Sequence, residues 1–226
     1  MRNRFDRQLK KLNDELIEMG SMIEKSIEKS LVALVTQNVD KAKEVIAYDV
    51  EIDRQEREIE SLCMKLLLQQ QPVARDLRLI SSALKMITDM ERIGDQSADI
   101  AELAIMMSQR TYTEELKHIS QMGQETMKMV IDSVDAFVEK DLQKAGEVIE
   151  HDDVVDGLFD TVKGEVIEII HKDRDMGEYA ADLLMAAKYF ERIGDHATNI
   201  AEWVVYSITG EHESESGNGN LYQSED

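Results

Sequence analysis

The chain has 226 residues, and its 47 acidic and 26 basic side chains give a net charge of −21. A hydrophobic content of 42% predicts a folded globular protein, because disordered chains have too few apolar residues to form a core. The negative charge disfavours binding to nucleic acid, to acidic membrane surfaces and to free anions such as phosphate, whereas it favours cations and basic protein partners.

Several other protein classes are disfavoured by composition. One proline and 5% aromatic residues are too few for an all-β fold, which needs many turns and strand-forming residues. Cys63 is the only cysteine, so an intrachain disulfide is impossible and we expect a reducing, cytoplasmic location. No apolar run approaches the ~20 residues that span a bilayer. We therefore expect contact with a membrane only through protein partners.

Apolar residues recur every three or four positions along most of the chain, which is the spacing of amphipathic α-helices. The first predicted helix covers residues 5–34, and Asn38 then offers a break and an N-cap. A second helix is predicted over residues 41–70. Pro72 ends that region and suits the start of a third helix, which continues to about residue 108.

The pattern then repeats. Residues 42–53 and 145–156 are identical at six of twelve positions, and residues 91–102 and 191–202 at eight of twelve. Matching in two separate blocks indicates an internal duplication. We therefore predict an all-α fold of two tandem three-helix bundles, six long helices related by a pseudo-two-fold internal repeat.

Three segments follow from this repeat. The first three-helix bundle is predicted over residues 1–109 and the second over residues 110–209. Residues 210–226 contain five acidic and no basic residues and little apolar content, so they are predicted to form a disordered acidic tail.

Acidic residues occupy helix positions that the apolar spacing assigns to the buried face. In the third helix, the apolar stripe that begins at Leu77 continues into Glu91 and Asp95, and Asp99 lies within about 80° of them. The second helix adds a pair of acids four residues apart, and the second repeat shows the same arrangement. The candidate ligands are Asp49, Asp53, Glu91, Asp95 and Asp99 in the first repeat, and Asp152, Asp156, Glu191 and Asp195 in the second.

Burying like charges without partners costs several kcal/mol, so we expect a positive species between the second and third helices. Sites built only from carboxylates suit hard cations, and the candidates are iron, manganese, magnesium or zinc, with zinc less favoured because His and Cys are absent from the pattern. Gly94 and Gly194 lie inside the two acid clusters and could admit close helix approach, water or an ion. The alternative interpretation is a solvated acidic face, or a carboxylate network with Arg92 and Arg192.

These residues carry a resemblance to a known family. The segment QPVARDLRLI at 71–80, followed by SALK at 82–85 and ERIGD at 91–95, resembles the PhoU family of phosphate-transport regulators. ERIGD recurs at 191–195, and the resemblance extends over residues 1–209.

The resemblance implies a cytoplasmic protein, not an enzyme, that acts as a negative regulator when phosphate is plentiful. Its implied partners are the phosphate-specific ABC transporter and a phosphate-sensing histidine kinase, and we also expect a homodimer. Several family members bind metal clusters through E(D)xxxD motifs, which correspond here to the four acid pairs named above. One departure is visible, since Asp99 becomes Asn199 and Glu56 becomes Phe159 in the second repeat, which leaves that site fewer charges.

Two other functions stay open. A di-metal carboxylate enzyme of ferritin-like or hydrolytic type would use a similar bundle, but ferritin-like sites need paired ExxH motifs, and the chain has one isolated candidate, Glu115 with His118. A purely structural helical dimer with satisfied acid–arginine pairs is the third possibility.

Overall fold

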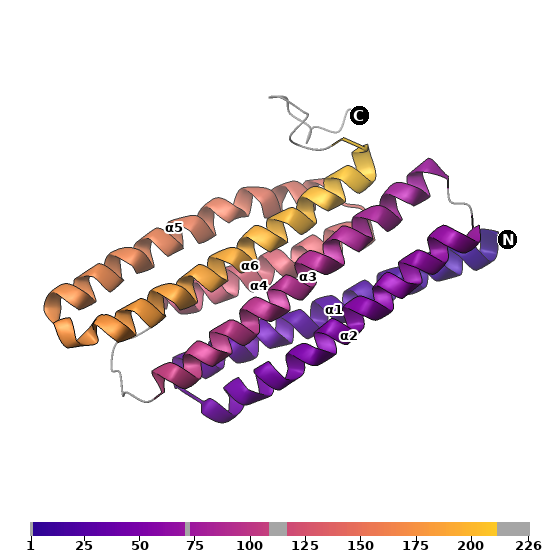
Figure 1. The fold of residues 1–226 in the computed structure, drawn as a ribbon. Helices are drawn as coiled ribbons and strands as arrows, with labels where there is room; N and C mark the ends of the chain where they lie inside the picture. The colour runs from indigo at the N-terminus through magenta and orange to yellow at the C-terminus, as the bar shows by residue number, and fades with distance from the viewer. Residues whose placement is uncertain (1, 71–72, 109–116, 212–226) are drawn as a thin grey trace.

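Six long helices make up most of the structure (Figure 1). A computed structural model describes residues 2–70, 73–108 and 117–211. A short 3₁₀ helix, η1 (Arg174–Met176), precedes the last helix. The six helices are α1 (Arg2–Thr36), α2 (Val39–Gln70), α3 (Ala74–Met107), α4 (Lys117–Glu139), α5 (Leu142–Lys172) and α6 (Gly177–Thr209).

The apolar spacing in the sequence explains where the core lies. In α1 the fully buried side chains follow the predicted steps of three and four residues, as in Leu12, Leu16, Met19 and Ile23. Helices α1, α2 and α3 pack against one another, as do α4, α5 and α6. The all-α fold of two three-helix bundles is therefore confirmed.

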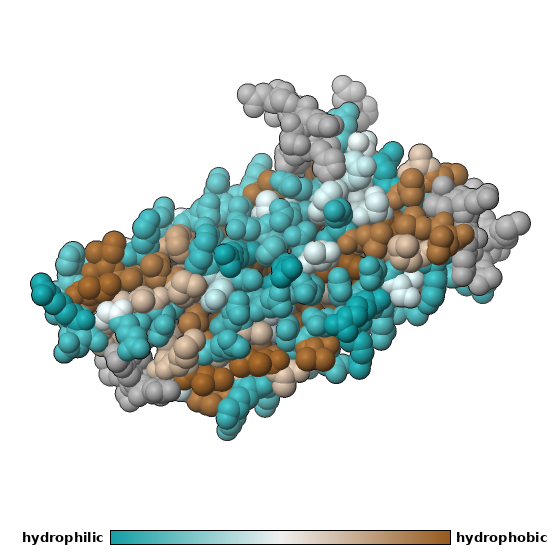
Figure 2. Space-filling model, viewed as in Figure 1, coloured by the Kyte–Doolittle hydropathy of each residue, from teal (hydrophilic) through white to brown (hydrophobic). Residues whose placement is uncertain are grey.

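The two bundles join along α3 and α6, which lie side by side in the middle of the molecule, and α1 also contacts α4 (Figure 1). The C-terminal end of α2 and the C-terminal end of α5 lie at opposite ends of the molecule (Figure 1). On the face that Figure 2 shows, hydrophilic residues cover much of the middle, and hydrophobic residues lie toward the two ends and along the lower edge.

The turn after the first helix of each repeat is built in the same way. Gln37 and Lys140 both have positive φ angles, 52° and 58°. Asn38 and Asp141 follow them, and each side-chain oxygen accepts a hydrogen bond of 3.0 Å from the backbone N–H three residues later. The N-cap predicted at Asn38 is confirmed, and its counterpart shows that the duplication extends to turn geometry.

The predicted segment boundaries fall largely outside the described residues. The boundary between residues 109 and 110 lies in the segment 109–116, and the acidic tail beyond residue 211 is also not described. Among the residues that are described, no helix is long and apolar enough to cross a membrane.

The predicted buried face of α3 was partly wrong. Leu77 is 49% exposed, and the buried side chains run instead through Ile80, Ala83, Ile87 and Met90. Leu77 lies in the first turn of α3, which begins at Ala74, so it is at the end of the helix and not along the central part that packs against α1, α2 and α6. The acids of α3 therefore lie half-buried at the edge of the α2–α3 contact and not in the core.

Candidate metal centre

Asp49 is the most enclosed acid of the first cluster. It lies on the core-facing side of α2, between the buried residues Val45 and Ile52. Its Oδ1 atom is buried and has no hydrogen-bond partner among the described residues. A Cβ atom at Gly94 of α3 would come within 3.1 Å of this oxygen and of Ile52. The mid-helix glycine therefore gives the Asp49 carboxylate room against α3.

Other predicted ligands surround this carboxylate. Burial, followed by repulsion from Asp95, Asp53 and Asp99, raises the pKa of Asp49 to about 6. Burial is also the main cause that raises the pKa of Glu91, and Asp95 adds to it. The structure thus brings all five acids predicted for the first repeat into one electrostatically coupled cluster, which we call the first acid cluster.

Two further acids, Glu56 and Glu102, lie next to this cluster. Burial raises the pKa of Glu56, with repulsion from Glu60 and Asp53 adding to it. Burial also raises the pKa of Asp99, where Glu102 is the next cause. Glu56 is four residues from Glu60 and three from Asp53 on α2, so helix spacing alone could have added it to the ligand set.

Arginines meet part of the negative charge. Arg92 contacts Glu91 at 3.6 Å and Asp95 at 3.1 Å. Arg57, which the sequence pattern did not single out, binds Asp53 at 3.0 Å. These pairs agree with the alternative interpretation of a carboxylate–arginine network. Among the described residues, however, no cation pairs with the Asp49 carboxylate. Asp49 is the acid of this cluster whose negative charge costs most free energy, because it is the most buried.

The second acid cluster, formed by Asp152, Asp156, Glu191 and Asp195, repeats the arrangement, although Asp156 and Asp195 are more exposed than Asp53 and Asp95. Burial, then Asp156 and Asp195, raise the pKa of Asp152 to about 6, and the Thr198 hydroxyl opposes this rise. A Cβ atom at Gly194 would lie 3.3 Å from Asp152 Oδ1. Asp156 and Asp195 are exposed.

A lysine enters the second cluster. Lys188 forms an ion pair with Glu191 and lies 5.5 Å from the ring centre of Phe159. Phe159 stands where the first repeat has Glu56, and Lys188 stands where it has Thr88. The second cluster therefore has both fewer acids and a cation of its own.

The two repeats meet through a contact that the sequence pattern did not predict. Asp89 of α3 accepts a hydrogen bond of 3.2 Å from the Asn199 amide, and its Oδ1 lies 2.9 Å from His196 Nδ1. His196 and Asn199 replace Gln96 and Asp99 of the first repeat. These two departures from the repeat therefore serve the contact between α3 and α6.

The donor atoms fit a hard cation, although the side chains are not drawn together around one point. Among the described residues, no group of three or more His, Cys, Asp or Glu side chains is positioned to hold a metal ion. The clusters nevertheless offer only carboxylate oxygens, and Asp49 has a buried oxygen without a partner. His118 lies 2.6 Å from Glu165, and Glu115 lies outside the described residues.

Known proteins with the same sequence pattern and fold were identified. The PhoU domain family model matches residues 16–104 and 119–204. A relative in Clostridium acetobutylicum, the "Phosphate-specific transport system accessory protein PhoU homolog", is 40% identical over 91% of this chain and 94% of its own length. A homolog of the same name in Pseudomonas aeruginosa is 35% identical over 91% of this chain and 86% of its own.

Solved structures agree with this likeness. The crystal structure of PhoU from Pseudomonas aeruginosa matches with a TM-score of 0.86 and 33% identity, over 92% of this chain and all of that one. The PhoU structure from Streptococcus pneumoniae, described as a phosphate transport system regulatory protein, matches with a TM-score of 0.85 and 28% identity, over 92% and 98% of the two chains.

Proposed function

Because this chain belongs to the PhoU family, we propose that it is a non-enzymatic regulator of phosphate uptake and phosphate signalling. The observation that carries the proposal is the similarity, at 40% identity over 91% of the chain, to a protein named as an accessory of the phosphate-specific transport system. The likeness includes both repeats, since the family model matches residues 16–104 and 119–204.

The proposal has a specific direction. The protein acts in the cytoplasm as a negative regulator when phosphate is plentiful, through the phosphate ABC transporter and a phosphate-sensing histidine kinase. Its net charge of −21 suits basic cytoplasmic surfaces of such partners, since opposite charges speed encounter and fix orientation. We also propose that it forms a homodimer.

Metal ions belong to the same proposal. Asp49, Asp53, Glu91, Asp95 and Asp99 would hold cations in the first cluster, and the four acids of the second cluster in the second. A bound cation would supply the positive charge that neutralises these carboxylates. The raised pKa of Asp49 and its unpartnered oxygen support this assignment, because both reflect negative charge without enough compensation.

A cellular test addresses the regulatory role. A reporter of the phosphate-starvation response is measured in the source bacterium, with and without the gene, in phosphate-rich medium. We expect the response to stay switched on without the protein and to be silenced when the wild-type gene is restored. A response that is silenced equally in both strains would contradict negative regulation.

Association with the transporter is tested separately. The protein is used to retain the detergent-solubilised transporter at low and at high salt. We expect retention at low salt and loss at high salt, because screening weakens contacts between exposed charges. A complex that is indifferent to salt would count against electrostatic docking.

The di-metal enzyme remains the alternative. Protein loaded with iron or manganese is assayed for oxygen consumption and for phosphoester hydrolysis. Turnover that is lost in an Asp49→Ala, Asp95→Ala variant would favour the enzyme over the regulator.

A further inference from the structure

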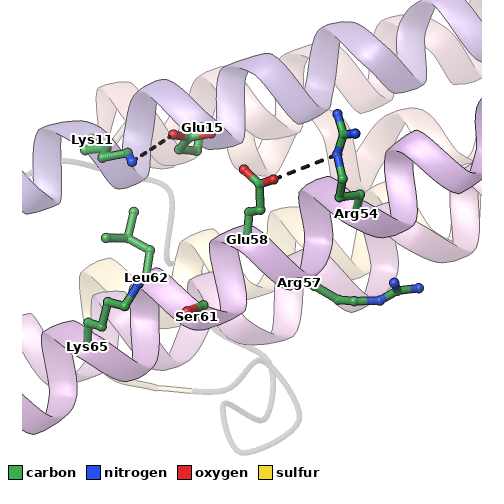
Figure 3. Close-up of a pocket in the computed structure, with 8 residues that line it drawn as sticks. All are labelled: Lys11, Glu15, Arg54, Arg57, Glu58, Ser61, Leu62 and Lys65. Atoms are coloured by element: carbon green, nitrogen blue, oxygen red, sulfur yellow. Dashed lines mark ion pairs between the residues drawn. The ribbon is translucent and has the colours of Figure 1, made fainter.

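A cavity of about 300 Å³ opens between α1 and α2, and none of the residues assigned to the acid clusters lines it. Figure 3 shows that its walls come from both helices, with Lys11 and Glu15 on α1 and the other six residues on α2. We call it the α1–α2 cavity. Its lining consists of Lys11, Glu15, Arg54, Arg57, Glu58, Ser61, Leu62 and Lys65.

The charge of this cavity is opposite to that of the chain. Four of its eight lining residues are basic and two are acidic, whereas the chain as a whole has 26 basic and 47 acidic residues. Salt screens distant charges over about 10 Å at 0.1 M. A small anion in the cavity therefore interacts mainly with nearby side chains, and in the lining the cations outnumber the acids. The prediction from net charge that the chain disfavours free anions does not extend to the cavity.

The internal repeat provides a control for this observation. In the second repeat, 103 residues later, Arg54 is replaced by Gly157, Arg57 by Asp160 and Lys65 by Glu168. The same helix pair can thus be built without any of these three cations. The basic lining is consequently a property of the first repeat and not a requirement of the fold.

The cations in the cavity pair with neighbouring acids through largely exposed side chains. Lys11 lies 3.5 Å from Glu15, and Arg54 lies 3.8 Å from Glu58 (Figure 3). Two shorter pairs involve acids outside the lining, since Arg54 lies 2.6 Å from Glu51 and Arg57 lies 3.0 Å from Asp53. Lys65 forms no ion pair within the described part of the chain. Exposed pairs of this kind contribute about 0–1 kcal/mol, so a ligand can displace them at little cost.

The carboxylate that lies deepest in the lining already has another partner. Gln55 of α2 donates a hydrogen bond of 2.8 Å to Glu15 Oε2 and a second, of 3.2 Å, to the Glu15 carbonyl oxygen. Glu15 is therefore held to α2 without Lys11. Lys11 can turn toward a ligand without leaving the Glu15 carboxylate unpaired.

We propose that the α1–α2 cavity binds the phosphoryl group of a small molecule. Guanidinium groups pair with phosphate oxygens in a bidentate manner, and the ammonium groups and the Ser61 hydroxyl add further donors. The volume exceeds that of one phosphate group, and buried Leu62 offers an apolar contact to an organic part. The ligand class is thus inorganic phosphate or a phosphate ester.

Binding of two probes to the purified full-length chain tests the proposal. Calorimetric titrations with inorganic phosphate and with ADP are carried out at low salt, in chelator, so that cations in the acid clusters do not contribute. We expect saturable binding of at least one probe. Tighter binding of inorganic phosphate would indicate free phosphate as the ligand, and tighter binding of ADP would indicate a phosphate ester. If neither probe binds saturably, the proposal is overturned.

Matched variants locate the binding. Lys65→Glu introduces the residue of the second repeat, and Lys43→Glu makes the same charge change at an exposed position of α2 outside the cavity. We expect Lys65→Glu and Arg54→Gln each to weaken binding about tenfold, and Lys43→Glu less than about twofold. Equal loss in Lys65→Glu and Lys43→Glu would show a general charge effect and refute the cavity.

This inference goes beyond the proposed function and does not depend on it. The titrations use the isolated protein, whereas the regulatory role is tested in cells. If the protein silences the starvation response but binds neither probe, phosphoryl binding in the cavity is refuted and the regulatory role stands. If it binds a probe but does not silence the response, the regulatory role is refuted and phosphoryl binding stands.

Discussion

The carboxylate of Asp49 on α2 lies against Gly94 on α3, where a Cβ atom would approach Asp49 Oδ1 to 3.1 Å. The second repeat places Asp152 against Gly194 in the same way, at 3.3 Å. A glycine inside a helix costs about 1 kcal/mol relative to alanine. At both sites the glycine leaves space for the aspartate of the facing helix. The close contact between the two helices and the position of this carboxylate therefore depend on the same glycine.

Gly94→Ala should therefore disturb the first acid cluster. The new methyl group meets the side chains of both Asp49 and Ile52 at 3.1 Å, so the carboxylate and the Ile52 side chain must each move by a few tenths of an ångström. We expect weaker Mn²⁺ binding and a stability that is unchanged or lower, because the clash offsets the gain in helix propensity. Mn²⁺ titration and thermal unfolding measure both effects.

The control for this variant is Gly157→Ala. No atom lies within 4 Å of a Cβ atom at Gly157 in the interior of α5, so only helix propensity changes. We expect stabilisation by up to about 1 kcal/mol and unchanged Mn²⁺ binding. If Gly94→Ala stabilised the protein as much as this control and left Mn²⁺ binding intact, the close approach of Asp49 would have no importance.

Asp49 should also make stability depend on pH. Its pKa of about 6 in the folded protein lies above the ordinary value of 3.8, so the folded state binds more protons between these values. The favourable contribution is complete below pH 3.8 and is lost as the pH rises through about 6. Without a cation, the ionised carboxylate therefore destabilises the fold at neutral pH.

Asp49→Asn removes this unfavourable charge. In chelator at neutral pH we expect the free energy of unfolding to rise by about 1 kcal/mol, after allowance for partial solvent screening, and to change little near pH 4. Urea unfolding at the two pH values measures the difference, with Asp160→Asn, at a 78% exposed side chain, as the control. A larger gain near pH 4 than at neutral pH would reverse the assigned sign.

The sequence predicted the helices and the repeat well, because both depend on local spacing and on matching blocks. It also placed Glu91 and Asp95 near Asp49. The apolar spacing puts these acids of the second and third helices on the sides that face each other, and consecutive helices of a bundle pack together. It could not predict that Leu77 is exposed, because helical spacing does not show which turns at the end of a helix extend past the neighbouring helices. Nor could it predict that Asp89 meets His196 and Asn199, which depends on how the two bundles join.

The two acid clusters should differ in cation affinity. The first has Glu56 where the second has the apolar Phe159, and Asp195 is more exposed than Asp95. Burial, Glu102 and Asp95 raise the pKa of Asp99, and Arg192 of α6 partly opposes this rise, so Asp99 contributes less to the difference than its charge suggests. We expect Asp95→Ala to lower the metal content of protein purified without chelator more than Asp195→Ala does, by elemental analysis. Equal losses would refute the difference.

Lys188 should weaken cation binding in the second cluster. It pairs with Glu191 there, and the first repeat has Thr88 at the same position. In an Asp95→Ala background, which weakens the first cluster, we expect Lys188→Thr to tighten Mn²⁺ binding about threefold to tenfold, since one nearby positive charge is removed. Lys163→Thr, at an exposed lysine that pairs with Asp160 outside the cluster, should leave Mn²⁺ binding unchanged. Equal effects of both variants would exclude a local role for Lys188.

Arg57 connects the first acid cluster with the α1–α2 cavity, because it binds Asp53 at 3.0 Å and also lines the cavity. A cation at Asp53 would compete with Arg57 and leave its guanidinium group available to an anion. Binding free energies are reciprocal, so cation and phosphoryl binding should strengthen each other. Arg54 also lines the cavity but pairs with Glu51 and Glu58, so it does not touch the cluster.

These two arginines therefore predict different outcomes. Arg57→Gln should tighten Mn²⁺ binding about threefold, because a competing positive charge is lost, and should weaken phosphate binding. Arg54→Gln should weaken phosphate binding and leave Mn²⁺ affinity unchanged. Each affinity is measured by titration in the absence of the other ligand, so that Mn²⁺ and phosphate do not combine in solution. If Arg57→Gln weakens Mn²⁺ binding, or if both variants change Mn²⁺ affinity equally, Arg57 does not couple the two sites.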